Sequence, residues 1–368
     1  MAPQAATISF RLGGDDGVSV EARKWESALR ELGFETRRIA GEIEDAGRTE
    51  DVSVPGLAIT ASRPTGAQID LDTFQAAVAD AELLIVDNIC SLPLNVDASR
   101  AVARIAAEHP GRVVFRHHDL PWQRRNLVHR ETEFPPREPD DALHVTVNLR
   151  SRRELEARGF RNAVTIHNYF DFDAPRGDRT ATRAAFGFTA DDLVVFQPAR
   201  AIERKNVPGG VRFATRLSAM GLDRAPHYWL SGPAEDGYGA TLERILDRAT
   251  VPCTIGRAAT ATDAFAASDV IVFPSTWEGF GNPTIESIIA RRPCAAFPYP
   301  VLAEIVASGV RLFSTERPEA VAYFLRAPGS VRQQAFDVNI RRARFSFDIT
   351  ELPGAIEAAF HDHGWTSW

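Results

Sequence analysis

The sequence is poor in cysteine and lysine and has no long apolar run. Its 368 residues include three cysteines, Cys90, Cys253 and Cys294, which are odd in number and widely spaced. They form neither a disulfide framework nor a paired-cysteine metal motif, so we expect a reducing compartment. Because no run of about 18 apolar residues occurs, the sequence predicts no membrane-spanning helix. The N-terminus lacks the basic and apolar regions of a signal peptide, and we expect a cytoplasmic protein.

The charge excludes a further class of partner. The 42 Lys and Arg residues against 49 Asp and Glu residues give a net charge of −7. Such a charge provides no overall attraction to nucleic acid, and no nucleic-acid partner is expected. Only Lys24 and Lys205 are lysines, so 40 of the basic residues are arginines. The histidines, cysteines and paired aspartates show no metal-binding spacing, and no metal site is predicted.

Short apolar runs alternate with segments of helical periodicity along most of the chain. Val18, Trp25 and Leu29 recur on one helical face, and Gly33 follows as a stop signal. This alternation predicts an α/β protein with parallel sheets and helices on both faces. The predicted strands cover residues 7–10, 83–87, 113–117, 145–148, 163–167, 193–197, 228–231, 270–273 and 294–297.

The pattern weakens once, between residues 170 and 192. This stretch is mostly polar and is interrupted by Pro175, Gly177 and Gly187. We therefore expect a boundary between two α/β domains there, with the domains over residues 1–175 and 190–345. The segment PPREPDD is predicted to be a surface loop.

The strongest motif is PSTWEGFGNPTIES, in which a loop joins an apolar strand to a helix. Asn282 is expected to cap the helix, with Pro283 at its first position. The amides of Gly281 and Asn282, with the helix dipole behind them, predict an anion site. Glu278 and Glu286 lie on either side of this loop. They would accept hydrogen bonds from hydroxyls of a polyol attached to the anion.

A second motif follows the predicted strand over 193–197. Arg200, Arg204 and Lys205 concentrate positive charge there, as a diphosphate requires. Arg204 is the weaker candidate because Glu203 beside it would pair with it. The alternative is a solvated loop without a ligand.

Together these motifs resemble a known family. Glu278 and Glu286, with seven residues between them, resemble the Glu-x7-Glu motif of retaining glycosyltransferases of family 4, also called glycosyl transferases group 1. Arg200 and Lys205 resemble that family's Arg-x4-Lys element, and they precede the glutamates by about 80 residues. The resemblance implies a GT-B fold, in which two Rossmann-like domains face a central cleft. It also implies that residues 346–368 cross back to the N-terminal domain.

Two stretches of the N-terminal half add to the resemblance. Gly13 and Gly14 resemble the family's glycine loop, which faces donor and acceptor; the alternative is a tight turn without a ligand. The loop is not a GxGxxG motif, so no nicotinamide or flavin cofactor is expected. His118 and Asp119 resemble a His-Asp pair, which implies that His118 lies near the transferred sugar and that Asp119 orients it. The alternative is a structural histidine.

A stretch of the second half resembles the family's Phe-x-Gly segment, whose backbone meets the nucleotide base. It contains Cys253, and Thr254 stands where the family has Phe. Only backbone recognition of the base is therefore expected. The donor base, whether of UDP, GDP or ADP, stays open.

The implied activity is transfer of a hexose from a nucleoside-diphosphate sugar to an acceptor hydroxyl, with retention of configuration and without metal or cofactor. Arg200 and Lys205 would hold the diphosphate, Glu286 the ribose and Glu278 the sugar hydroxyls. The acceptor would be a small polar molecule or a glycan, bound by the N-terminal domain. The alternatives are a sugar-nucleotide epimerase of similar architecture and a non-catalytic sugar-nucleotide-binding subunit. The Arg-rich stretch 148–161 is expected to form a solvated helix face rather than a membrane contact.

Overall fold

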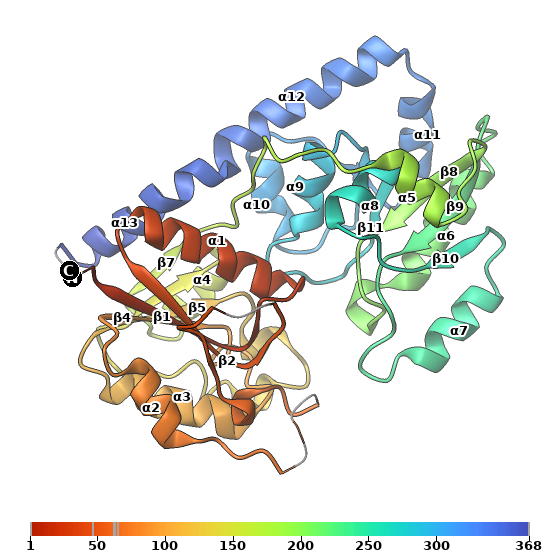
Figure 1. Cartoon of the computed structure of the whole chain (residues 1–368). Coiled ribbons are helices and arrows are strands. Elements are labelled where there is room, and N and C mark those ends of the chain that lie inside the picture. Colours follow the sequence, from red (N-terminus) through yellow and green to blue (C-terminus); the bar gives the residue numbers. More distant parts are fainter. Residues whose placement is uncertain (1, 46–47, 62–63, 65, 367–368) are drawn as a thin grey trace. The chain divides into compact units, whose positions relative to one another are not determined.

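The computed structural model describes residues 2–45, 48–61, 64 and 66–366, and the chain forms two compact units. The first unit contains the residues up to Tyr169 and those from Ile349 onwards, and the second runs from Phe170 to Asp348 (Figure 1). The polar stretch 170–192 thus lies within the second unit. It contains the short helix α5 (Arg179–Ala185), which Asp178 caps by accepting from the Ala181 amide.

The first unit is built around a parallel sheet. Its strands in the described part of the chain are β1 (Gln4–Leu12), β2 (Glu35–Ile43), β3 (Val52–Ser53), β4 (Leu83–Asp87), β5 (Arg112–His117), β6 (Leu143–Thr146) and β7 (Ala163–Thr165). Its helices are α1 (Gly17–Glu31), α2 (Leu71–Val78), α3 (Val96–Glu108), α4 (Leu149–Ala157) and α13 (Leu352–Asp362), with short 3-10 turns at Pro55–Leu57, Pro121–Gln123, Val128–Arg130 and Ile349–Glu351. The strand order is β3-β2-β1-β4-β5-β6-β7.

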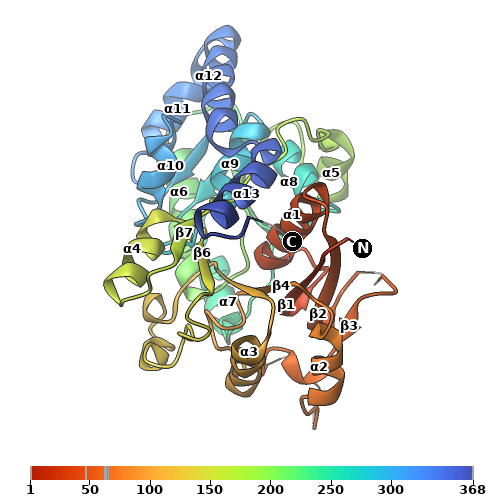
Figure 2. The ribbon, with the colours of Figure 1, turned by 90° about the vertical axis from the view of Figure 1, so that its left-hand side faces the viewer.

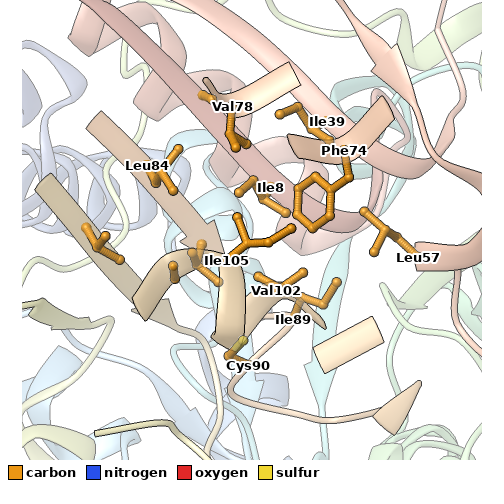
Figure 3. Packing of buried hydrophobic residues seen from close by; sticks show 14 of the residues in the cluster. Ile8, Ile39, Leu57, Phe74, Val78, Leu84, Ile89, Cys90, Val102 and Ile105 are labelled. Atoms are coloured by element: carbon orange, nitrogen blue, oxygen red, sulfur yellow. The ribbon is translucent and has the colours of Figure 1, made fainter. Parts of the chain in front are cut away.

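Helices cover both faces of this sheet. Phe74 of α2 and Val102 and Ile105 of α3 pack against Ile8 and other buried residues of one face (Figure 3). On the opposite face, Trp25 of α1 shares a cluster with residues of α13, and these two helices lie side by side (Figure 2). The last helix of the chain therefore completes the core of the first unit.

The second unit contains a parallel sheet of order β10-β9-β8-β11-β12-β13. Its strands are β8 (Asp192–Gln197), β9 (Ala225–Leu230), β10 (Cys253–Ile255), β11 (Val270–Phe273), β12 (Cys294–Ala296) and β13 (Phe313–Ser314). Besides α5, its helices are α6 (Val207–Ser218), α7 (Gly239–Asp247), α8 (Ala261–Ala267), α9 (Asn282–Ile289), α10 (Leu302–Ala307), α11 (Pro318–Arg326) and α12 (Gly329–Phe347), with a 3-10 turn at Glu203–Lys205. The predicted α/β architecture with two parallel sheets is confirmed.

In each sheet the strand order reverses direction once. The reversal lies between β1 and β4 in the first unit and between β8 and β11 in the second. In parallel α/β sheets, ligands bind beyond the carboxyl ends of the strands at such a reversal. The loops that follow these four strands are therefore where a site is expected.

Several of the strand predictions need correction. The strand predicted over 145–148 ends at Thr146, because Asn148 instead caps α4 by accepting from the Ser151 amide at 2.7 Å. The strands β2, β3, β10 and β13 were not predicted. Charged residues interrupt the apolar pattern of β2, and the other three are only two or three residues long. Arg38 within β2 is buried and pairs with Asp51 at 2.5 Å and Asp45 at 2.8 Å.

Candidate functional site

Two loops of the second unit, one after β8 and one after β11, are fastened together at the reversal of strand order. The Thr276 amide donates to the Arg204 carbonyl at 2.9 Å, and the Asn206 side chain donates to the Pro274 carbonyl at 3.2 Å. Asn206 has a positive φ of 50° and also caps α6. These two hydrogen bonds fix the basic loop against the loop that carries Glu278.

Glu278 lies between two cations of the basic loop. Its Oε1 accepts from Lys205 Nζ at 2.6 Å, and its Oε2 accepts from Arg204 Nη1 at 2.9 Å. Arg204 also donates to the Trp277 carbonyl at 3.1 Å. The side chains of Lys205 and Glu278 are only 13% and 10% exposed, so this charged cluster is largely removed from water. We call Arg204, Lys205 and Glu278 the basic cluster.

The charges in the basic cluster do not balance. Burial lowers the pKa of Lys205 to about 8; Glu278 opposes this shift, while Arg204 and Arg200 add to it. Burial alone would raise the pKa of Glu278, but the charges of Lys205 and Arg204 lower it to about 2. One carboxylate is shared by two cations, which leaves an excess of positive charge in a desolvated place. Such a place favours binding of an anion.

Arg200 is not part of this bridge. Its guanidinium pairs with Glu235 at 2.5 Å, and both side chains are about one-third exposed, at 34% and 39%. The sequence did not single out Glu235. It could have been found from its place in the loop after β9, because β8 and β9 are neighbours in the sheet and their carboxyl ends lie side by side.

The helix α9 begins one residue earlier than expected. Gly281, rather than Asn282, occupies the N-cap, and Asn282 is the first helical residue. Gly281 has a φ of 104°, and a Cβ there would lie 2.0 Å from the Tyr299 hydroxyl. That hydroxyl donates to the Phe280 carbonyl at 3.0 Å, so only glycine fits between the loop and the Tyr299 ring. Glu286 lies in the second turn of α9 and is half-buried.

Cys253 lies on β10, the edge strand of the second sheet. Its thiol donates to the Val251 carbonyl at 3.4 Å and packs beside the hydrophobic core, where burial raises its pKa to about 11. The side chain of Thr254 is hydrogen-bonded to His227 at 2.8 Å. The Cys253 thiol and the Thr254 hydroxyl therefore already have hydrogen-bond partners within the second unit.

In the first unit, the glycine loop follows β1 and approaches acidic side chains. Gly13 has a φ of 83°, and a Cβ there would lie 2.4 Å from an Asp45 oxygen. A Cβ on Gly14 would lie 2.7 Å from a Glu44 oxygen. Asp16 caps α1, accepting from the Val18 amide at 3.0 Å. Arginines accompany these carboxylates: Asp45 pairs with Arg38 at 2.8 Å, Asp16 pairs with Arg11 at 3.2 Å, and Arg23 donates to the Gly14 carbonyl at 2.7 Å.

The orientation predicted for His118 is wrong in one respect. Asp119 does not contact it and instead pairs with Arg124. The partner of His118 is Asp87, whose Oδ1 lies 3.0 Å from Nε2. The sequence analysis did not select Asp87, because it is the last residue of an apolar strand and belongs to no recognised motif. The available signal was that β4 and β5 are neighbours, so their last residues lie together.

His117 is a core residue. Its Nδ1 is hydrogen-bonded to Ser91 at 2.6 Å and its Nε2 to His144 at 3.0 Å, and the two imidazoles stack. Burial lowers the pKa of His117 well below its ordinary value and that of His144 to about 3. Of the two adjacent histidines, only His118 is accessible to a ligand.

The Arg-rich helix α4 contains ion pairs between residues four positions apart. Arg150 contacts Glu154 and Arg152 contacts Glu156, both at 2.8 Å, which agrees with a solvated face. Across the described ranges, no helix has both the length and the apolar character to cross a membrane. Among the same residues, no three His, Cys, Asp or Glu side chains are grouped to hold a metal ion.

Known proteins are similar to this chain over much or all of its length. Residues 216–327 match the family model described as glycosyl transferases group 1. The mannosylglucosylglycerate synthase of Petrotoga mobilis is 25% identical over 364 residues, which cover 82% of this chain and 83% of that protein. The synthase of the same name from Thermotoga maritima is 24% identical and covers 84% of each chain.

A solved structure extends the likeness to the fold. The structure of Anabaena Alr3699/HepE, in complex with UDP and glucose, superimposes with a TM-score of 0.71 at 16% identity and covers 98% of this chain and all of that one. The GT-B fold expected from the sequence is thereby confirmed. The chain is a glycosyltransferase with this fold, related to the glycosyl transferases group 1.

Proposed function

We propose that the chain transfers a hexose from a nucleoside-diphosphate sugar to an acceptor hydroxyl, with retention of configuration and without a divalent cation. The observation that carries this proposal is the basic cluster. Lys205 and Arg204 share one carboxylate, and the cluster stands at the reversal of strand order in the second sheet. A donor diphosphate would take up the excess positive charge, which replaces the neutralisation that a metal ion supplies in other enzymes.

Glu278 has two uses in this proposal. In the free protein its carboxylate occupies Lys205 and Arg204, which keeps two buried cations from repelling each other. When the diphosphate arrives, the cations gain a second anionic partner, and Glu278 accepts hydrogen bonds from the sugar hydroxyls. The departing diphosphate is stabilised by the same cations, so binding and leaving-group stabilisation share one set of residues.

The other roles follow from position. Arg200 contributes a further cation on the same loop, at the cost of its exposed pair with Glu235. The first turn of α9, at Gly281 and Asn282, directs amide dipoles toward the phosphates, and Glu286 accepts from the ribose hydroxyls. Gly13 and Gly14 let the backbone of their loop approach the donor and the acceptor closely. His118 contacts an acceptor or sugar hydroxyl.

The relatives support a sugar donor and a sugar acceptor. The HepE structure holds UDP and glucose, and the two similar synthases are named for mannosylglucosylglycerate. Glucosylglycerate is therefore the first acceptor to assay, and glucosyl and mannosyl donors carrying UDP, GDP or ADP are the first donors.

The test is an incubation of the full-length protein with each donor, with and without acceptor, in a chelator. Acceptor-dependent release of nucleoside diphosphate together with a new glycoside is expected. Conversion of the donor to an epimer without acceptor would show a sugar-nucleotide epimerase instead. Tight nucleotide binding without turnover of any donor would show a binding subunit.

A further inference from the structure

Four residues of alternating charge lie in a row in the first unit, from Asp87, the partner of His118, to Lys24, whose side chain is 19% exposed. Arg116 Nη1 donates to Asp87 Oδ2 at 2.9 Å, and Arg116 Nη2 lies 3.7 Å from Glu21. Lys24 Nζ in turn donates to Glu21 at 2.6 Å and to the Tyr169 carbonyl at 2.6 Å. Asp87, Arg116 and Glu21 are each at most 1% exposed.

This arrangement keeps Asp87 ionised. Burial alone would raise the pKa of Asp87, but the charges of Arg116 and His118 outweigh it and hold the pKa below its ordinary value. Arg116 is itself fixed, since its guanidinium lies 4.8 Å from the centre of the Trp25 ring. The four charges of the network sum to zero.

An ionised carboxylate only accepts hydrogen bonds. Its contact with His118 Nε2, at 3.0 Å, therefore requires that Nε2 carries the hydrogen. In the neutral imidazole this leaves Nδ1 with a lone pair. Within the described ranges of the chain, Nδ1 has no hydrogen-bond partner, and the His118 side chain is 13% exposed.

We infer that Asp87 is a positioning residue that fixes the hydrogen of His118 on Nε2, so that Nδ1 is the atom that accepts a hydrogen bond from a substrate hydroxyl. The inference rests on the proposed function, in which His118 contacts such a hydroxyl. It adds which ring nitrogen does so, in which direction the hydrogen bond runs and which buried group enforces it.

The neighbouring His117 differs from His118 in that neither of its ring nitrogens is available to a ligand. His117 has both ring nitrogens engaged, one with Ser91 and the other with His144, and it is fully buried. Only His118 combines one nitrogen anchored to a buried carboxylate with one available to a ligand. Its anchoring is of the kind that orients histidines in catalytic sites generally.

The test begins with the protonation state of His118 in the full-length wild-type protein. With ¹⁵N-labelled histidine, the signal that disappears in His118→Gln identifies the residue. Nitrogen–proton correlation spectra recorded over a range of pH should show that the neutral imidazole carries its hydrogen on Nε2 and leaves Nδ1 bare. A neutral imidazole with its hydrogen on Nδ1, or with an even mixture of the two tautomers, would overturn the inference, and this measurement needs no folded Asp87 variant.

The second measurement uses Asp87→Asn, which keeps the size of the side chain and removes its charge. The tautomer preference should relax toward a mixture, and kcat should fall about 10- to 100-fold with the donor KM little changed. Asp80→Asn, which removes an exposed ion pair with Arg37 on the same unit, is the matched control and should leave both unchanged. A preserved tautomer and preserved kcat in Asp87→Asn would contradict the inference.

The two proposals fail separately. If no nucleoside-diphosphate sugar is bound or turned over, the proposed function fails while the tautomer of His118 can still be read. If transfer occurs but Nδ1 carries the hydrogen, only the role given to Asp87 is wrong.

Discussion

At the scale of single residues, the two lysines of this arginine-rich chain both lie in buried networks of alternating charge. Lys24 pairs with Glu21 and Lys205 with Glu278, each at 2.6 Å. A lysine ammonium is a compact point charge whose pKa shifts on burial, whereas a guanidinium stays charged. The sequence predicted Lys205 as a residue that binds the donor diphosphate. It did not predict the pairing with Glu278, because contacts between two loops depend on which strands are neighbours.

The pKa of Lys205 predicts how donor binding depends on pH. Since its pKa is lowered to about 8, Lys205 loses its charge at higher pH, while Glu278, with a pKa of about 2, stays ionised throughout. The affinity for a sugar nucleotide should therefore be constant below about pH 7.5 and weaken by up to about tenfold per unit above pH 8. Binding should also be accompanied by proton uptake in that range.

Calorimetric titrations in buffers of different ionisation enthalpy, from about pH 7 to pH 9, measure both quantities. In Lys205→Ala the pH dependence should vanish along with most of the affinity. A dissociation constant that is flat across this range in the wild type would mean that Lys205 does not contact the bound donor.

At the scale of elements, the loop and helix after β11 were the most predictable part of the site. The motif indicated a strand, a glycine loop and a helix with Pro283 at its start, and β11 and α9 follow that order. The N-cap was misplaced by one residue because the decisive contact comes from Tyr299, which lies on a later segment. Strand β2 and the partner of His118 were missed for the same reason, since both depend on charges brought together only by the fold.

Gly281 is the position in this loop and helix where a substitution should most affect stability. With a φ of 104° and a Cβ position 2.0 Å from the Tyr299 hydroxyl, Gly281→Ala should strain both the backbone and the ring contact. The backbone term alone is expected to cost about 1–3 kcal/mol. Each kcal/mol lowers Tm by about 2–4 °C in a unit of this size.

Thermal unfolding of the full-length variant checks this prediction. Gly329→Ala is the matched control, because a Cβ there meets nothing within 4 Å and φ is not positive. Its Tm should stay within about 2 °C of the wild type. Equal Tm values for the two variants would show that the α9 loop does not require glycine.

At the scale of the whole molecule, the two units share the same kind of sheet topology. Each unit has a parallel sheet whose strand order reverses once. The predicted ligand-binding residues follow the strands at or beside that reversal, except Cys253, which lies on the edge strand β10. Strand and helix alternation was sufficient to predict this architecture, because buried parallel strands are continuous apolar runs. The return of the last helix to the first unit was expected only from the family resemblance. Its own sequence carries no sign of its packing against α1.

The central claim is that the basic cluster of the second unit holds a donor diphosphate without a metal ion. Calorimetric titration of UDP, GDP and ADP into the full-length protein, in a chelator, tests it most directly. One of them should bind the wild type, and Lys205→Ala should weaken it about 10- to 100-fold, as loss of a charged hydrogen bond predicts. Arg317→Ala removes a cation whose side chain is 76% exposed and should leave the affinity unchanged. Equal affinity in the wild type and Lys205→Ala, or no binding of any of the three nucleotides, would contradict the account.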